Sequence, residues 1–354
     1  MERGEKVLSS LLDFELASAA HILARDLVHV KLGEHVLVYA DSESDWAVAE
    51  ATARAVHNVG GKVALMRYPA PRGVGEDADV DLPEPLSAAM INCDLMIEFS
   101  KMYLLYSTPW RRAMQAKRAR YLCLSGMTSD MMARCVGGIN VDALIKFQDK
   151  IAELTRNAKR MRITTPAGTD VEFENDPKRP VFTEGVVADR PGDYMLVGQV
   201  DWAPVERTLK GKIVFDGAVW PPDDLGKLAN PVTMTIHAGR VVSIDGGREA
   251  RVFSKWLDGF NDPAMHNVAH AAYGCNPGAK LSGRIVEDER VWGAVEWGLG
   301  YQGESFLGVS GPAKTHTDGI CLNASIWMDG KQISTEGTYV HPELASLGKL
   351  ASRG

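Results

Sequence analysis

The stretch that decides the fold is "EHVLVYADSESDWAVAEATARAVHNVGGKVALMRYP", residues 34–69. It begins with a continuous apolar run, which is typical of a strand buried on both faces. Apolar residues then recur with helical spacing over residues 43–60, where Gly60 ends the pattern, and residues 61–69 form a second apolar run. Strand, helix and strand in this order predict a βαβ unit with parallel strands and a right-handed crossover.

The same alternation continues along the N-terminal half. Residues 93–100 and 120–126 read as strands, and residues 108–117 between them read as a helix. We therefore predict an α/β domain over residues 1–157, with an open parallel sheet in a Rossmann-like layer. No glycine-rich phosphate loop follows its strands, and the segment "YADSESD", residues 39–45, carries side chains where a pyrophosphate would need space. This argues against a nucleotide site.

The second half has a different pattern. Residues 159–175 are two alternating runs joined by the turn "PAGT", and residues 210–220 and 231–247 repeat that arrangement with glycine-containing turns. Asp193 reads as a turn residue after "RPG", and residues 248–260 have helical periodicity. We predict a β-rich α+β domain over residues 158–354, and it is in this domain that we expect a metal site.

Composition narrows the class of protein. With 45% hydrophobic residues, 24% charged residues and a net charge of −7, the chain is typical of a globular protein and unlike a nucleic-acid binder. No apolar run approaches the roughly 20 residues of a membrane span, so we expect no membrane association. Five cysteines without CxxC spacing predict buried, reduced thiols and a cytoplasmic location.

Candidate metal ligands gather near the C-terminus. In "AKTHTDGICLN", residues 313–323, His316 and Asp318 stand two apart, so on a strand their side chains project from the same face. In "NDPAMHNVAHAAYGCNPGAK", residues 261–280, His266 and His270 stand four apart and would share one face of a helical turn. Each pair alone is weak evidence, because an exposed His followed by Asp-Gly also occurs in simple turns.

A further carboxylate lies between these two histidine segments. Glu296 is surrounded by small and apolar residues in "ERVWGAVEWGLGYQG", residues 289–303. Burying such a carboxylate is costly unless a cation or hydrogen-bond donors compensate for it. A bound metal ion would be one such compensation.

The order of these segments resembles the aminopeptidase T superfamily, and within it most closely the 2,5-dihydroxypyridine 5,6-dioxygenase family. The resemblance covers most of the chain and is clearest from about residue 160 onward. It rests on a histidine before "GCNPGA" and a later H-x-D, here His270, His316 and Asp318. The resemblance implies that these three side chains hold one non-haem Fe(II) ion. It also implies a small hydroxylated aromatic substrate, O₂ as co-substrate and a homo-oligomer.

Other positions match the family less well. Where the dioxygenases have "LLHS" this chain has "LLYS", so Tyr106 stands in place of a histidine implied to be an acid or base. A phenol donates a hydrogen bond but is a poor base at neutral pH. Tyr106, Glu184 and His266 are therefore candidates for substrate contact or proton transfer. The alternatives are aromatic packing for Tyr106, an ion pair for Glu184 and, for His266, contact with a metal ligand.

Two other functions stay open at this point. If Glu296 is a fourth ligand, the site favours a hydrolase with Mn(II) or Zn(II), in which a metal-bound water attacks and Glu296 or Glu184 is the base. The chain would then resemble an aminopeptidase, a deaminase or an amidase. The remaining possibility is a non-catalytic descendant that keeps the fold as a binding protein.

Overall fold

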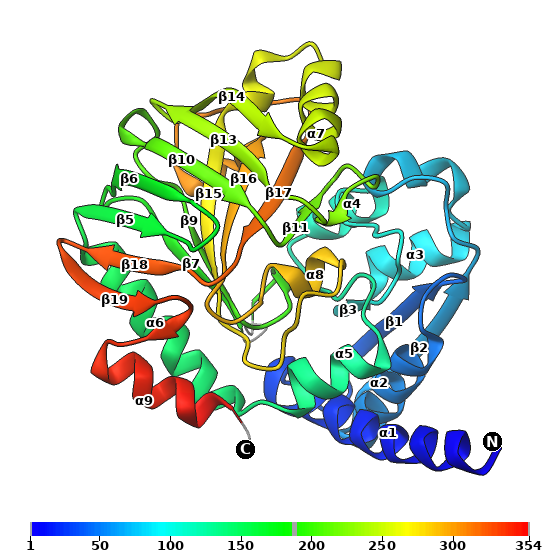
Figure 1. The fold of residues 1–354 in the computed structure, drawn as a ribbon. Helices are drawn as coiled ribbons and strands as arrows, with labels where there is room; N and C mark the ends of the chain where they lie inside the picture. Colours follow the sequence, from blue (N-terminus) through cyan, green and yellow to red (C-terminus); the bar gives the residue numbers. More distant parts are fainter. Residues whose placement is uncertain (1, 186–189, 353–354) are drawn as a thin grey trace. The chain divides into compact units, whose positions relative to one another are not determined.

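The structure, a computed structural model, describes residues 2–185 and 190–352. It contains two compact units, each assembled from separate stretches of chain (Figure 1). The first comprises Met1–Val141 and Glu184–Val197, and the second comprises Asp142–Thr183 and Gly198–Gly354. No helix among the described residues combines the length and the apolar character needed to span a membrane.

The first unit is built on a five-stranded parallel sheet in the order β2-β1-β3-β4-β8. Its strands are β1 (His35–Asp41), β2 (Lys62–Tyr68), β3 (Leu95–Glu98), β4 (Arg120–Cys123) and β8 (Gly192–Met195). Its helices are α1 (Glu2–Ile22), α2 (Trp46–Asn58), α3 (Glu84–Asn92), α4 (Thr108–Gln115) and α5 (Ser129–Met132), with shorter turns η1 (Leu23–Leu27), η2 (Gly75–Asp81) and η3 (Ala133–Gly137). The side chain of Asp45 caps α2 by accepting a hydrogen bond from the Ala47 amide. The predicted βαβ units are present.

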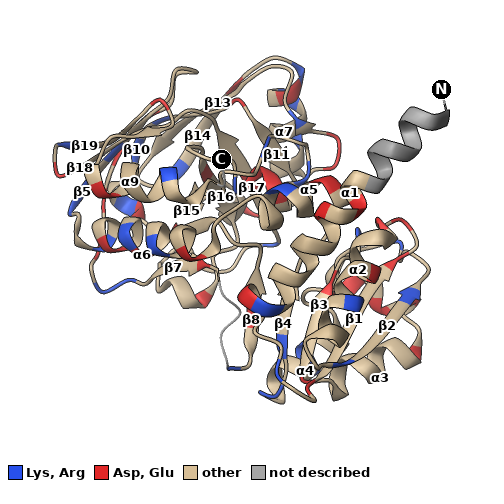
Figure 2. Cartoon of the chain, turned by 90° about the horizontal axis from the view of Figure 1, so that it is seen from below, with Lys and Arg blue, Asp and Glu red and all other residues tan. Residues whose placement is uncertain are grey.

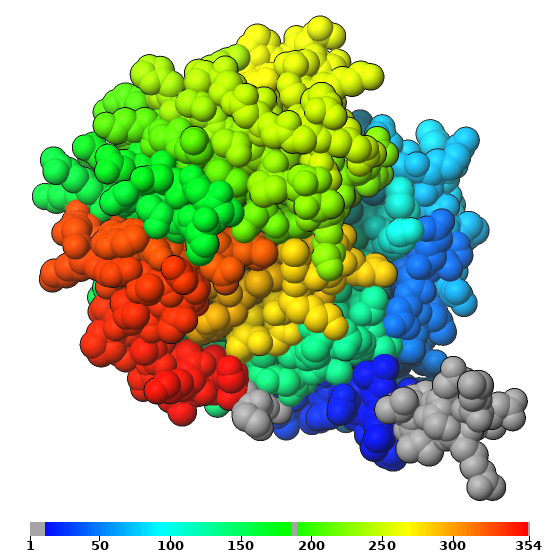
Figure 3. All heavy atoms as spheres, in the orientation of Figure 1, coloured from blue at the N-terminus to red at the C-terminus, as the bar shows by residue number. Residues whose placement is uncertain are grey.

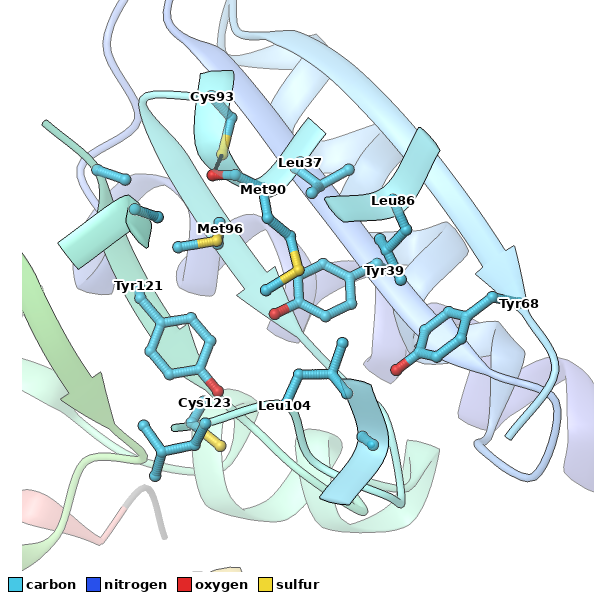
Figure 4. Packing of buried hydrophobic residues seen from close by; sticks show 14 residues of the cluster. Leu37, Tyr39, Tyr68, Leu86, Met90, Cys93, Met96, Leu104, Tyr121 and Cys123 are labelled. Atoms are coloured by element: carbon cyan, nitrogen blue, oxygen red, sulfur yellow. Dashed lines mark hydrogen bonds between the residues drawn. The ribbon is translucent and has the colours of Figure 1, made fainter. Parts of the chain in front are cut away.

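One face of this sheet carries a core of tyrosine, methionine and leucine side chains (Figure 4). Tyr39, Met96 and Tyr121 come from three neighbouring strands and are fully buried. The Tyr121 hydroxyl donates a hydrogen bond to the carboxylate of Glu98, which is also fully buried. The Glu98 carboxylate is thus paired with a polar group of this core rather than with solvent.

The second unit holds two antiparallel sheets. The eight-stranded sheet has the order β14-β13-β10-β6-β5-β18-β19-β20. Its strands are β5 (Arg160–Thr164), β6 (Asp170–Glu174), β10 (Lys210–Phe215), β13 (Val232–His237), β14 (Arg240–Gly246), β18 (Ser325–Met328), β19 (Lys331–Thr335) and β20 (Thr338–Tyr339). The pairing of β5 with β18 brings together segments from the two ends of this unit, which are seen side by side in Figure 3.

The seven-stranded sheet has the order β12-β11-β17-β16-β15-β9-β7. Its strands are β7 (Val181–Glu184), β9 (Gln199–Trp202), β11 (Ala218–Trp220), β12 (Gly226–Lys227), β15 (Val268–Gly274), β16 (Val295–Gly300) and β17 (His316–Cys321). The helices of this unit are α6 (Val141–Asn157), α7 (Arg248–Gly259), α8 (Ile285–Asp288) and α9 (Pro342–Ala351), with η4 (Glu206–Thr208), η5 (Pro263–His266) and η6 (Glu304–Phe306).

The two sheets pack on each other through aromatic rings. The ring of Phe173 on β6 meets Trp297 on β16 edge to face, with centroids 5.8 Å apart. Trp297 is fully buried, and because side chains alternate along a strand, Glu296 and Gly298 face the opposite side of the seven-stranded sheet. That opposite side carries the candidate site. Figure 2 shows acidic and basic residues interleaved along the helices and strands of both units.

The arrangement differs from the sequence prediction in three places. Helix α6 belongs to the second unit and residues 184–197 belong to the first, whereas we expected a single boundary between residues 157 and 158. Asp193, interpreted as a turn residue after "RPG", lies within β8, which pairs with β4. Strands β10 and β11 are not a hairpin, because β10 pairs in the eight-stranded sheet and β11 in the seven-stranded sheet. The hairpins β5–β6 and β13–β14 are confirmed.

Candidate metal centre

Three adjacent strands of the seven-stranded sheet place the candidate ligands. Gly298 on β16 lies opposite His270 on β15 and opposite Asp318 on β17. Residues directly opposed in an antiparallel sheet point to the same face. His316 lies two residues before Asp318, and Glu296 two residues before Gly298, so both share that face. The strand register alone therefore gathers all four side chains.

Gly298 occupies the middle of this row for a steric reason. A Cβ atom added there would lie 2.3 Å from Cε1 of His270 and 2.7 Å from Cε1 of His316. Carbon atoms in van der Waals contact are about 3.5–4.0 Å apart, so neither imidazole could keep its place. The two rings lie over the glycine with centroids 5.1 Å apart and planes within 8° of parallel.

The structure brings three predicted ligands within reach of one ion. One nitrogen or oxygen atom each from His270, His316 and Asp318 lies within 4.8 Å of the others. Oδ1 of Asp318 is 2.8 Å from Nε2 of His316 and 3.7 Å from Nε2 of His270. All three side chains are partly buried. Two imidazoles and one carboxylate are the donor set typical of mononuclear non-haem iron sites.

The hydrogen bonds of His316 fit a bound cation. Nδ1 of His316 is 2.7 Å from the carbonyl oxygen of Tyr301, and Nε2 faces the Asp318 carboxylate. Both partners are acceptors, yet a neutral imidazole has only one N–H to donate. If Nδ1–H donates to the Tyr301 carbonyl, Nε2 presents its lone pair beside a carboxylate, as a metal-binding histidine does. The residues present therefore fit a metal ion.

Glu296 is buried next to His270 and extends the cluster. Its Oε1 is 2.7 Å from Nε2 of His270, and its Oε2 accepts a hydrogen bond of 2.6 Å from the Gln199 amide. Burial and the charge of Asp318 raise the pKa of Glu296, while His270 opposes them. Burial lowers the pKa of His270, but Glu296 and Asp318 outweigh it and raise that pKa to about 9. Glu296 and Asp318 therefore favour the protonated form of His270, and a metal ion at Nε2 would replace that proton.

His266 lies apart from these residues. Residues 263–266 form η5 and β15 begins at Val268, so the predicted helical turn through both histidines is wrong. Nε2 of His266 is 3.3 Å from Oδ1 of Asp258 on α7. Asp258 also lines a surface depression of about 380 Å³ between β14 and α7, which includes none of the predicted site residues. A catalytic role for His266 stays a prediction.

Two further predicted residues belong to the first unit. Tyr106 has a backbone φ of 72°, is 51% exposed and packs its ring edge to face against Trp110. A positive φ is uncommon for a bulky residue and is found where the surroundings fix the backbone. Glu184, at the end of β7, accepts a hydrogen bond of 3.1 Å from the Met195 amide. Their roles in catalysis stay predictions.

Sequence reasoning missed three groups that shape this site, namely Gln199, the Tyr301 carbonyl and Gly298. Strand alternation in "VEWGLG" places Gly298 on the same face as Glu296, so its position could have been inferred. Nothing in the sequence around Gln199 marks it, because its role depends on the pairing of β9 with β15. Every residue has a main-chain carbonyl group, so no sequence pattern could identify the role of the Tyr301 carbonyl.

Comparison with known proteins agrees with the resemblance seen in the sequence. A family model described as 2,5-dihydroxypyridine 5,6-dioxygenase matches residues 21–341. The solved structure of 2,5-dihydroxypyridine dioxygenase from Pseudomonas putida KT2440 has 21% sequence identity and a TM-score of 0.74, covering 93% of this chain and 98% of that chain. Wild-type AmpT from Thermus thermophilus has 14% identity and a TM-score of 0.64, covering 92% and 99%. A search of curated proteins found no match.

Proposed function

The chain belongs to the 2,5-dihydroxypyridine 5,6-dioxygenase family and is a metal-dependent, ring-cleaving dioxygenase, and from this premise we propose the metal, its ligands and the substrate. The metal is Fe(II), held by His270, His316 and Asp318. The substrate is a small hydroxylated N-heteroaromatic ring such as a dihydroxypyridine, with O₂ as co-substrate. The observation that supports this most is the convergence of these three donors, distant in sequence, on one face of a sheet.

Bound here, Fe(II) would hold the ring and O₂ side by side and let electrons pass between them, so that both oxygen atoms enter the opened product. The protein residues have the positioning roles. The Tyr301 carbonyl fixes the imidazole of His316, and Gln199 fixes Glu296 beside His270. Tyr106 and Glu184 are the proposed groups for substrate contact and for donating or accepting its protons.

A hydrolase is the second candidate, and one observation favours it. Glu296 lies 2.7 Å from Nε2 of His270, where it would serve as a fourth ligand and occupy a position that O₂ needs. That chemistry would run on Mn(II) or Zn(II) with a metal-bound water. The family match favours the dioxygenase.

Location and assembly are part of the same proposal. All five cysteines are buried and none forms a disulfide, which supports a reducing compartment such as the cytoplasm. We propose a homo-oligomer by resemblance to the family. Sedimentation velocity on the purified protein measures its oligomeric state directly.

Oxygen consumption tests the proposed activity. Protein prepared without oxygen and loaded with Fe(II) is expected to consume O₂ with one or more members of a panel of dihydroxypyridines and aminophenols, and Zn(II)-loaded protein is expected not to. Turnover that persists without oxygen on Mn(II) or Zn(II) would instead establish the hydrolase. Protein that binds no metal would exclude both activities.

A further inference from the structure

His270 and His316 are both candidate metal ligands, but different kinds of contact hold them in place. Nδ1 of His316 is 2.7 Å from the Tyr301 carbonyl oxygen. Among the residues that the structure describes, Nδ1 of His270 has no hydrogen-bond partner. Metal-binding histidines almost always donate their second ring N–H to an acceptor. Another contact must therefore orient the His270 imidazole when an ion occupies its Nε2.

Phe306 makes such a contact, and we propose that it is a positioning residue for His270. Its ring is stacked on the imidazole, with centroids 5.4 Å apart and planes within 9° of parallel. Aromatic rings favour offset-stacked or edge-to-face contacts at centroid separations of about 4.5–7 Å. The inference rests on the proposed metal site, and it goes beyond that proposal by naming the side chain that orients one of the ligands.

The stacked pair belongs to a continuous row of rings that crosses the seven-stranded sheet. His270 on β15 is also stacked on His316 on β17, with planes within 8° of parallel. At the other end of the row, Phe182 on β7 meets Phe306 edge to face, with centroids 5.3 Å apart. In the sheet order, β17 and β7 lie on opposite sides of β15. Rotation of the His270 imidazole would therefore break ring contacts in both directions.

Hydrogen bonds attach the loop between β16 and β17, which contains η6, to strand β15. The side-chain amide of Gln302 donates a hydrogen bond to the Ala269 carbonyl, and the Ser310 hydroxyl donates one of 2.9 Å to the Val268 carbonyl. These two acceptors directly precede His270 in the sequence. The loop is thus tied to β15 before and after η6, close to the candidate ligand.

The buried carboxylate of Glu206 joins the two sides of the same loop. Its Oε1 accepts hydrogen bonds from the Val309 amide at 2.8 Å and from Nε2 of Gln302 at 3.1 Å. A Cβ atom at Gly308 would lie 2.3 Å from that oxygen, so the loop closes tightly around the carboxylate. Because these bonds are internal to the protein, Phe306 is held in place before an ion binds, which lowers the cost of ordering its ring.

The stacked ring contributes most when Nε2 of His270 binds a cation. Nε2 is 2.7 Å from Oε1 of Glu296, and an ion at this nitrogen would replace the hydrogen bond between them. The ring contacts then orient the imidazole. A cation also draws electron density from the imidazole, and the negative face of the Phe306 ring stabilises the partial positive charge that results. Phe306 should therefore strengthen metal binding more than it stabilises the free protein.

Metal affinity measured without substrate or O₂ tests the inference. We expect Phe306→Leu to raise the Kd for Co(II) about tenfold in competition with a chromogenic chelator, because leucine keeps an apolar side chain but removes the stacked ring. The visible absorption bands of bound Co(II), which report the geometry of its ligands, should shift as well. Phe306→Tyr keeps the ring and should stay within about threefold of the wild type, with unchanged bands.

Two further variants keep the test sharp. Phe260→Leu is the matched control, because this partly buried phenylalanine packs edge to face against Trp256 and contacts no candidate ligand; it should leave affinity and absorption bands unchanged. Phe182→Leu removes the edge-to-face support of Phe306 and should raise the Kd about threefold. It tests the same row of rings if Phe306→Leu does not fold, which circular dichroism would show.

The outcomes separate this inference from the proposed function. Phe306→Leu protein that binds Co(II) as tightly as the wild type would overturn the inference, as would equal losses in Phe306→Leu and Phe260→Leu. A wild type that binds no metal would overturn it together with the proposed metal site. Weaker binding in Phe306→Leu alone supports it whether or not the wild type consumes O₂. A wild type that binds metal without consuming O₂ contradicts the dioxygenase alone.

Discussion

Each unit buries a glutamate within an apolar strand, Glu98 in β3 and Glu296 in β16, and the two differ in what surrounds them. Glu98 is fully buried and accepts hydrogen bonds from the Tyr121 hydroxyl and, at 2.8 Å, from the Leu104 amide. Glu296 is 2% exposed and is bonded to Gln199 and His270. The first set of partners ends within the core. The partners of Glu296 lead through His270 to two further candidate ligands, His316 and Asp318. The hydrogen-bond partners of a buried carboxylate, rather than its burial, therefore indicate function.

The largest effect expected from this contrast follows removal of a ligand. We expect His316→Ala to lose bound metal and to lower dioxygenase turnover at least about a thousandfold, because a catalytic metal supplies several kcal/mol. Metal analysis and an oxygen electrode measure both quantities. Glu98→Gln, the matched control in the other unit, should keep its metal. Stoichiometric metal in His316→Ala would show that the cluster is not the binding site.

The next largest effect concerns the glycine between the imidazoles. Gly298→Ala places a Cβ against both rings and should weaken metal binding about a hundredfold. Competition with a chromogenic chelator measures the affinity. Gly259→Ala is the control, since an added Cβ there meets no atom within 4 Å. Equal affinities in the two variants would contradict the packing argument.

The pH dependence of the free energy of unfolding tests the environment of Glu98. Burial raises the pKa of Glu98 to about 7, against opposing hydrogen bonds from Tyr121 and Leu104. The folded state therefore holds this proton more tightly than the unfolded state, and stability should fall by roughly 2 kcal/mol as the pH rises from about 5 to 7.5. Urea unfolding at the two pH values measures the loss. If Glu98→Gln shows the same pH dependence, another group causes it.

The smallest expected effect on metal affinity follows removal of the Gln199 side-chain amide, which donates a hydrogen bond to Glu296. Gln199→Leu removes the 2.6 Å hydrogen bond while keeping the size of the side chain, and should weaken metal binding about tenfold. Chelator competition again measures the change. Gln148→Leu, at another buried glutamine, serves as control. A tenfold loss in both variants would mean that the effect is one of general stability.

Local patterns predicted those features of the fold and site that local forces determine. Helical spacing and apolar runs predicted β1, β2, β3 and β4 with helices α2 and α4, and the period of two placed His316 and Asp318 on one face. Glycine-containing turns predicted the hairpins β5–β6 and β13–β14 correctly but not the link between β10 and β11. The same residue types bend the chain whether the next strand pairs with its neighbour or joins another sheet.

The remaining errors come from long-range pairing. The amphipathic pattern of α6 shows that one face is buried but not against which sheet. His266 and His270 satisfy helical spacing, yet β15 begins between them because its apolar residues complete a sheet. Glu98 and Glu296 are both single carboxylates in apolar runs, and only tertiary structure distinguishes them.

The interleaving of the two units has a consequence for synthesis on the ribosome. The first sheet needs β8, which is translated after α6, β5, β6 and β7 of the second unit. Until residues 192–195 emerge, β4 is an open edge with unpaired main-chain groups, the kind of edge that invites association with other chains. A fragment cut after residue 157 would keep that edge permanently, so the N-terminal half is a poor candidate for separate expression.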